Sequence, residues 1–395
     1  MSFFTQIFAV SWLSLKTIPQ RLGSSAVAVV GIAGVVIVFV AVLSMAQGFY
    51  AAMTAAGSPD RALVMRSGAD DEMTSGIGGP EADIIKQAPG LRHEGALPLA
   101  AAELFVLIDL PKLSTGTPAN VPMRGIDPAS FGVRAEAKLT EGRMLRFGTN
   151  EVVVGRAAAR TYAGLTVGSE IKAGQNSWVV VGMFESRGSV AETEIWCDAR
   201  FLQGAYRRGN SFQSVRARLE SPQTYGQFKD WLTSNPQLNV SVHPEMEYYM
   251  AQSVTLTRLI RSVGFAIAVL MGIGAVFGAI LTMYTAVSTR TREIATLRAL
   301  GFNTASVLVS VLAESFGLAA LGGALGGLLA YVGFNGYQTS TMNWQTFSQV
   351  AFAFAVTPGL LAQGLGYALV MGFIGGLLPA VRAARLPISS ALREL

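Results

Sequence analysis

Residues 315–381 contain no aspartate, glutamate, lysine or arginine. Few chains that fold in water have an uncharged segment of this length. The whole chain is 51% hydrophobic and 14% charged, whereas soluble domains carry about 25% charged residues. Residues 60–247, by contrast, have an ordinary density of charge. Two such regimes in one sequence predict a soluble domain framed by membrane-spanning segments.

Four apolar stretches reach the roughly 20 residues that an α-helix needs to cross a bilayer. We place them at residues 24–47, 258–289, 304–332 and 356–381. The expected fold is a membrane protein with four transmembrane α-helices and a large α+β extracytoplasmic domain, residues 48–257, inserted between the first two. The first stretch could instead be a cleaved signal peptide, but its apolar run exceeds the about 7–15 residues typical of those.

Positive charges beside the spans predict their orientation, because cytoplasmic loops are enriched in lysine and arginine. These residues are Lys16, Arg21, Arg290, Arg292, Arg298, Arg382, Arg385 and Arg393. Both termini, the connector 290–303 and the tail 382–395 are therefore expected in the cytoplasm, and the uncharged loop 333–355 outside. Arg258 and Arg261 break the rule unless the second helix begins inside the outer domain, which is what we expect.

Residues 1–23 precede the first span. Phe4, Ile7, Phe8 and Trp12 recur there at helical spacing, and Pro19 ends the pattern. This predicts an amphipathic helix, which could lie on the cytoplasmic leaflet or pack against the other helices.

The inserted domain alternates strand-like and helix-like patterns. The predicted strands are 104–110, 151–154, 178–184 and 215–219, and the predicted helices are 156–162, 199–206 and 224–233. The acidic, glycine-containing segment 68–79 is expected to be a mobile loop. Glu192 and Glu194 beside Trp196 are interpreted as a solvated strand end, with a contact surface as the alternative.

No catalytic or metal-binding motif accompanies the two histidines, His93 and His243. Cys197 is the single cysteine, so a disulfide within the chain is excluded and a small core residue is expected. The net charge of +5 comes with no basic block or stripe, which argues against nucleic acid as a partner. We therefore expect neither catalytic residues nor a metal or cofactor in this chain.

The connector between the second and third spans is the most informative segment. It predicts a helix over 290–300 that Gly301 ends, with the next span beginning a few residues later. A short helix between two spans suits an element that a cytoplasmic partner pushes, although an ordinary charged connector would have a similar composition.

The run REIATLRALG at 292–301, followed by Glu314 and the glycine-rich 322–327, resembles the permease module of the MacB/FtsX class of ABC transporters. The closing segment 375–392, with its Pro-Ala pair, doubled alanine and final Ala-Leu, is similar to that family too. Segments 123–128, 141–143, 151–155 and 165–171 resemble the MacB-type core domain. The resemblance thus spans nearly the whole chain.

The resemblance implies a permease subunit in a bacterial inner membrane. MacB carries an ATPase domain before its first span, whereas this sequence contains no G-x-x-x-x-G-K-[ST] loop, so ATP and Mg²⁺ are expected on a separate ATPase subunit. That subunit would contact Arg290, Arg292, Glu293, Leu297, Arg298 and Gly301, and in the tail Arg382, Arg385, Pro387 and Leu392. Further expected partners are a second permease, identical or homologous, and a periplasmic adaptor with an outer-membrane duct.

The spans themselves favour transmission of motion over conduction of a polar substrate. Glu314 is the one ionisable residue well inside a span, and a structural role inside the bundle is favoured for it. The small residues Gly322, Gly323, Gly326 and Gly327 permit close helix packing, within one chain or between two protomers. We expect export of a substrate collected outside the inner membrane; lipoprotein release, as in LolC and LolE, and FtsX-like control of a cell-wall hydrolase are the alternatives.

Overall fold

The computed structural model describes residues 22–344 and 346–387, which divide into two compact units. The helical unit comprises the described residues up to Gln47, then Leu259–Tyr337, and those from Phe354 onward. The inserted domain comprises Gly48–Arg258 together with Gln338–Ala353. It is therefore built from two separate stretches of chain. The predicted amphipathic helix at 1–23 lies almost wholly outside the described residues.

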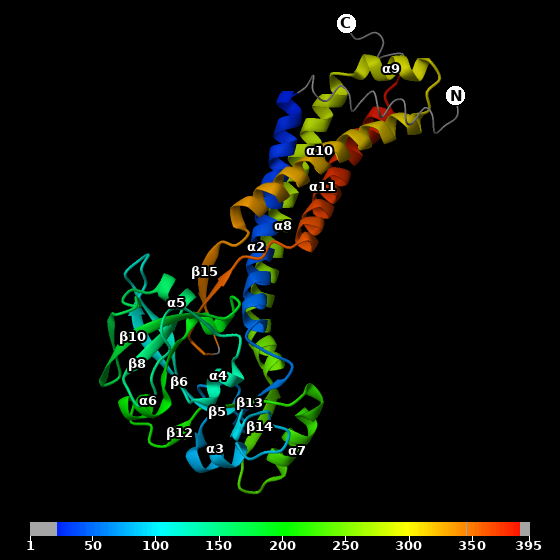
Figure 1. Cartoon of the computed structure of the whole chain (residues 1–395). Helices are drawn as coiled ribbons and strands as arrows, with labels where there is room; N and C mark the ends of the chain where they lie inside the picture. The colour runs from blue at the N-terminus through cyan, green and yellow to red at the C-terminus, as the bar shows by residue number, and fades with distance from the viewer. Residues whose placement is uncertain (1–21, 345, 388–395) are drawn as a thin grey trace. The chain divides into compact units, whose positions relative to one another are not determined.

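The helical unit is a bundle of long apolar helices (Figure 1). They are α2 (Leu22–Thr54), α8 (Glu245–Ser288), α10 (Thr304–Phe334) and α11 (Pro358–Ala384). By length and composition alone, each of the four could cross a membrane. α2 and α8 are longer than the predicted spans, and α8 begins well before Arg258, as the charge pattern predicts.

Glycines bring three of these helices into close contact. Gly322 and Gly326 of α10 face α2, where a methyl group on Gly326 would lie 2.6 Å from the carbonyl oxygen of Ala33. Gly323 of α10 faces α11, and a methyl group there would lie 2.8 Å from Cβ of Ala368. Gly327 meets α11 less tightly. Within this chain, these glycines therefore let α10 approach α2 and α11 closely.

Replacing Gly326 by alanine is expected to destabilise the bundle, because neither the Ala33 carbonyl nor Cβ of Val36, at 2.9 Å, can move without shifting α2. Overpacking of this kind costs about 1–3 kcal/mol. Gly278→Ala is the matched control, since nothing lies within 4 Å of the added methyl group. Thermal unfolding of the detergent-solubilised chain should show a lower midpoint for the first variant alone. Equal midpoints would contradict the assigned packing.

The inserted domain is an α+β fold around a mixed ten-stranded sheet. The path runs β14-β1-β13-β5-β6-β11-β8-β10-β7, with β9 pairing to β10. Its strands are β1 (Arg61–Arg66), β5 (Ala100–Pro111), β6 (Pro118–Ile126), β7 (Lys138–Gly142), β8 (Glu151–Gly155), β9 (Glu170–Ala173), β10 (Asn176–Glu185), β11 (Ile195–Asp198), β13 (Ser214–Arg218) and β14 (Val240–Pro244). The four strands predicted from sequence all belong to this sheet.

Short helices cover the sheet and complete two apolar cores. They are α3 (Gly79–Ile85), α4 (Ala129–Val133), α5 (Arg156–Thr161), α6 (Ala199–Ala205), α7 (Tyr225–Ser234) and the 3-10 turns η2 (Val190–Thr193) and η3 (Pro222–Thr224). The small strands are β2 (Ile77–Gly78), β3 (His93–Glu94), β4 (Leu97–Pro98) and β12 (Ser211–Phe212). One core contains Trp178, and the other contains Phe228 of α7. Cys197 is buried in the first, as expected.

The connection between α10 and α11, predicted as a plain loop at 333–355, contains a β-hairpin. Its strands β15 (Gln338–Met342) and β16 (Gln349–Ala353) belong to the inserted domain. The Asn120 side chain donates to the Phe347 carbonyl at 3.0 Å, and that of Asn343 to Gln252 Oε1 at 3.1 Å. A loop is expected from the sequence because this segment joins two spans and carries no charge, and neither property excludes strands.

Candidate functional site

The segment between α8 and α10 forms the predicted short helix, α9 (Thr291–Ala299). Gly301 follows it with φ +92°, a left-handed conformation that residues with a side chain rarely adopt. The side chain of Asn303 then accepts a hydrogen bond from the Ala305 N–H and caps α10. We call residues 289–303 the α9 corner.

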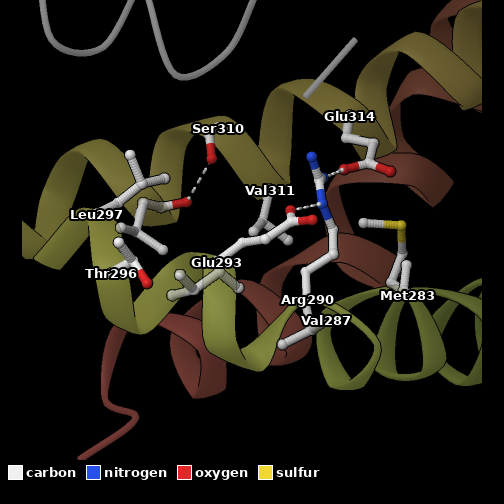
Figure 2. A pocket seen from close by; sticks show the side chains of 12 residues that line it. Met283, Val287, Arg290, Glu293, Thr296, Leu297, Ser310, Val311 and Glu314 are labelled. Atoms are coloured by element: carbon white, nitrogen blue, oxygen red, sulfur yellow. Dashed lines mark hydrogen bonds and ion pairs between the residues drawn. The ribbon is translucent and has the colours of Figure 1, made fainter. Parts of the chain in front are cut away.

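Arg290 is buried in this corner and forms ion pairs with α9 and α10. It is 8% exposed, and its Nη1 lies 3.2 Å from Oε2 of Glu314 on α10. Its Nε lies 3.1 Å from Oε2 of Glu293 on α9. Figure 2 shows the guanidinium reaching between the two carboxylates. Because a buried charge is costly unless it is paired, this triad joins the end of α8 to both neighbouring helices.

A cavity of about 320 Å³ surrounds the triad. Its walls are mostly apolar side chains of α8, α9 and α10, among them Met283, Val287, Leu297 and Val311 (Figure 2). The triad and the buried Ile294 and Ala295 are among the contacts that hold α9 to the bundle.

The chain after α11 is tied to the same corner. The Arg298 guanidinium donates to the Leu386 carbonyl, and the Leu386 side chain packs in an apolar cluster that includes Ile294. The Arg382 guanidinium lies 5.3 Å from the ring centroid of Tyr284 on α8. α9 and the start of the tail therefore form one surface.

The outward face of α9 differs from its inner one. Arg292 is exposed, the Glu293 side chain is 65% exposed, and Leu300 is 73% exposed. Arg385 and Pro387 in the tail are also exposed. This face therefore carries charges of both signs and an exposed leucine.

A second cluster of charge lies buried in the inserted domain, and its centre is Arg124 on β6. This side chain is 1% exposed and pairs with three carboxylates. The distances are 2.8 Å to Glu72, 3.0 Å to Glu103 and 2.7 Å to Glu194. Burial favours the neutral form of Glu72, but the positive charges of Arg124 and Arg216 outweigh it and lower the pKa of Glu72.

The first residue of α8 joins this buried network. Glu245 is fully buried and pairs with Arg216 on β13 and, at 2.5 Å, with Arg61 on β1. Tyr249, one turn further along α8, accepts from Arg216 at 2.9 Å. The network thus fastens the start of α8 to the sheet of the inserted domain.

Two predictions about these carboxylates were wrong. Glu194 and Glu192 are not a solvated strand end, because β11 has strands on both sides and both residues are buried. The segment 68–79 is not simply a mobile acidic loop, since Glu72 is 4% exposed and paired to Arg124. Glu72 and Glu194 are buried because both pair with Arg124, which is distant from each of them in sequence.

Two known protein families match this chain, one in its N-terminal half and the other in its C-terminal part. Residues 25–235 match the family described as the MacB-like periplasmic core domain, which covers more than half of the chain. Residues 265–388 match the FtsX-like permease C-terminal family. This chain belongs to the MacB/FtsX-type permeases. The resemblance seen in its motifs is confirmed, and the α+β domain is a MacB-like periplasmic domain.

Individual relatives of this permease are more distant. It is 25% identical over 301 residues to the macrolide export ATP-binding/permease protein MacB of Bdellovibrio bacteriovorus, covering 69% of this chain and 44% of that protein. It is 39% identical over 127 residues to the MacB protein of Nitrobacter winogradskyi, covering 32% and 18%. The permease therefore spans less than half the length of these curated relatives.

Two solved structures are similar to about half of this chain. The periplasmic region of MacB from Actinobacillus actinomycetemcomitans has 12% identity and a TM-score of 0.37, covering 52% of this chain and 94% of that one. The extracellular domain of the noncanonic ABC-type transporter YknZ from Gram-positive bacteria has 14% identity and a TM-score of 0.35, covering 46% and 99%.

Within this permease, the residues expected to contact a partner differ in where they lie. Arg290 and Arg298 face inward or toward the tail, whereas Arg292 and Glu293 face outward. Leu297 lines the cavity and Gly301 forms the turn. Leu392 lies outside the described residues. Among those described, no group of three or more histidine, cysteine or acidic residues could hold a metal ion.

Proposed function

We propose that the chain is the permease subunit of a MacB-type ABC complex in a bacterial inner membrane. ATP and Mg²⁺ bind to a separate ATPase subunit, and hydrolysis there moves the periplasmic domain. The movement exports a substrate taken from the periplasm or the outer leaflet. All four long helices span the membrane in this proposal, with the domain inserted between the first two on the outer side.

The observation that carries the proposal is the course of α8. It runs 44 residues without a break from Glu245 to Ser288. Glu245 is bound in the ion network of the inserted domain, and the residues after Ser288 form the α9 corner. A hydrogen-bonded helix that is fixed at both ends transmits a displacement of one end to the other.

The interior of the bundle supports transmission over conduction. α10 and α11 meet through small residues, and Gly372 lies so close to α10 that a methyl group would be 2.4 Å from Cβ of Ala319. Glu314, buried among these helices, is paired with Arg290. Such packing offers little polar lining for a hydrophilic substrate.

The ATPase subunit binds the outward face of α9 and the tail, where Arg385 and Pro387 are exposed, in this proposal. A second permease, identical or homologous, completes the complex, and a periplasmic adaptor with an outer-membrane duct receives the substrate. Co-purification of an adaptor would favour export, whereas capture of acylated lipoproteins or activation of a hydrolase would favour the alternatives.

Charge reversal of Arg292 is expected to reduce co-purification of the ATPase about tenfold or more, because the side chain is exposed on α9. Arg258→Glu is the matched control, an exposed arginine on α8 far along the chain from α9. Both variants should insert and accumulate like the native chain. Unchanged ATPase recovery with Arg292→Glu would remove the assigned docking face.

A further inference from the structure

A polar hollow of about 380 Å³ lies in the inserted domain. It is bordered by α5, by the end of β10 with the loop after it, and by β15 of the hairpin. Four cationic side chains line it: Lys138, Arg156, Arg160 and Arg187. The amide of Gln338 lies at its edge and accepts from Arg160 Nη1 at 3.3 Å.

The carboxylates of the hollow are already engaged. Glu185 pairs with Arg156 at 2.6 Å, and Glu136 pairs with Arg61 at 2.5 Å. Oε1 of Glu192 accepts the N–H groups of Ser186 and Gly188, both at 2.7 Å. Lys138, Arg160 and Arg187 form no ion pair with any described residue, so the hollow carries an excess of positive charge.

The backbone around Arg187 is held in an unfavourable conformation. Its φ is +52°, in the left-handed region where residues with a branched or long side chain are uncommon. The two hydrogen bonds to the buried Glu192 hold the loop in this shape. Strain maintained by its surroundings is a feature of binding sites, and here it places a guanidinium at the rim of a cationic hollow.

We propose that this hollow binds a phosphate-type oxyanion, either a free phosphate group or a phospholipid headgroup. Guanidinium groups recognise such anions through paired N–H donors. Arg160 and Arg187 supply donors from two different elements, and Lys138 adds charge. Because Gln338 begins the hairpin that follows α10, the bound anion also links that hairpin to α5. The site is independent of any ATPase coupling.

The test is calorimetric titration of the full chain, solubilised in a maltoside detergent and phosphate-free buffer, with inorganic phosphate and separately with dibutyroyl phosphatidylglycerol. Arg160→Gln combined with Arg187→Gln should weaken binding about tenfold or more. Arg200→Gln combined with Arg208→Gln is the matched control, since it removes two exposed arginines that do not line the hollow. Added NaCl should weaken binding of either probe.

Saturable binding of inorganic phosphate that only the first double variant loses supports the site and identifies a free oxyanion as sufficient. The same pattern with the phosphatidylglycerol alone supports it with a headgroup as ligand. Absence of saturable binding by both probes, or equal weakening in the two double variants, overturns the proposal.

Discussion

Arg124→Leu is expected to lower the free energy of unfolding of the inserted domain by about 3–5 kcal/mol, because it leaves buried carboxylates without their common partner. Glu72, Glu103 and Glu194 all lie within 3.0 Å of the Arg124 guanidinium. Denaturant unfolding of the solubilised full chain, followed by tryptophan fluorescence, measures the loss. Trp196 is a suitable reporter, since its Nε1 donates to Glu194 at 2.7 Å.

Two further variants test whether the buried network causes this loss of stability. Arg124→Lys retains the charge but cannot reach three carboxylates with a planar fork, so an intermediate loss is expected. Arg143→Leu removes an arginine that is bonded to Glu151 but has a 44% exposed side chain, and the midpoint should not change. Equal effects of Arg124→Leu and Arg143→Leu would show that the buried network is not what holds the domain together.

The same network fixes the direction of the pH dependence. Burial raises the pKa of Glu72 and Glu103, but the surrounding arginines outweigh it and hold both below the ordinary value of 4.5. A carboxylate whose pKa is lower in the folded state than in the unfolded chain stabilises the fold fully above its unfolded pKa. This contribution is lost as the pH falls through the folded-state pKa. The native domain should therefore lose stability below about pH 4.5, and Arg124→Leu should lose less on acidification.

The apolar helices and the sheet could be predicted because their signals are local. The alternation in β10 and the valine run of β8 report burial directly, and the predicted ranges match these strands closely. The left-handed Gly301 ends α9 where the sequence predicts. In each case neighbouring residues carry the information that determines the structure.

The charged sites could not be predicted in the same way, since their partners are distant in sequence. Glu72 stands among glycine and aspartate, a composition typical of solvated loops, and Arg124 is 52 positions away. Arg290 looks like the other arginines of its connector until α10 brings Glu314 to it. The hairpin at 338–353 was hidden for a related reason, because its packing surface is supplied by the inserted domain.

Arg290→Leu is expected to speed amide hydrogen exchange in α9 about a hundredfold, because it leaves Glu314 buried without this partner. Glu314→Leu should have a smaller effect, since Glu293 still pairs with Arg290 at 3.1 Å. Each variant is measured by exchange of Thr291–Ala299 in the full chain. α2 amides provide the internal reference.

The double variant Arg290→Leu with Glu314→Leu separates the loss of a pair from the loss of packing. Replacing both charges by apolar groups of similar size removes the carboxylate together with the guanidinium it pairs with, and adds apolar contacts in the cavity. Exchange in α9 should therefore be slower than in Arg290→Leu alone. If the double variant exchanges as fast as Arg290→Leu, the Arg290–Glu314 pair does not hold α9, and the corner must be fixed by Ile294 and the tail contact at Arg298 instead.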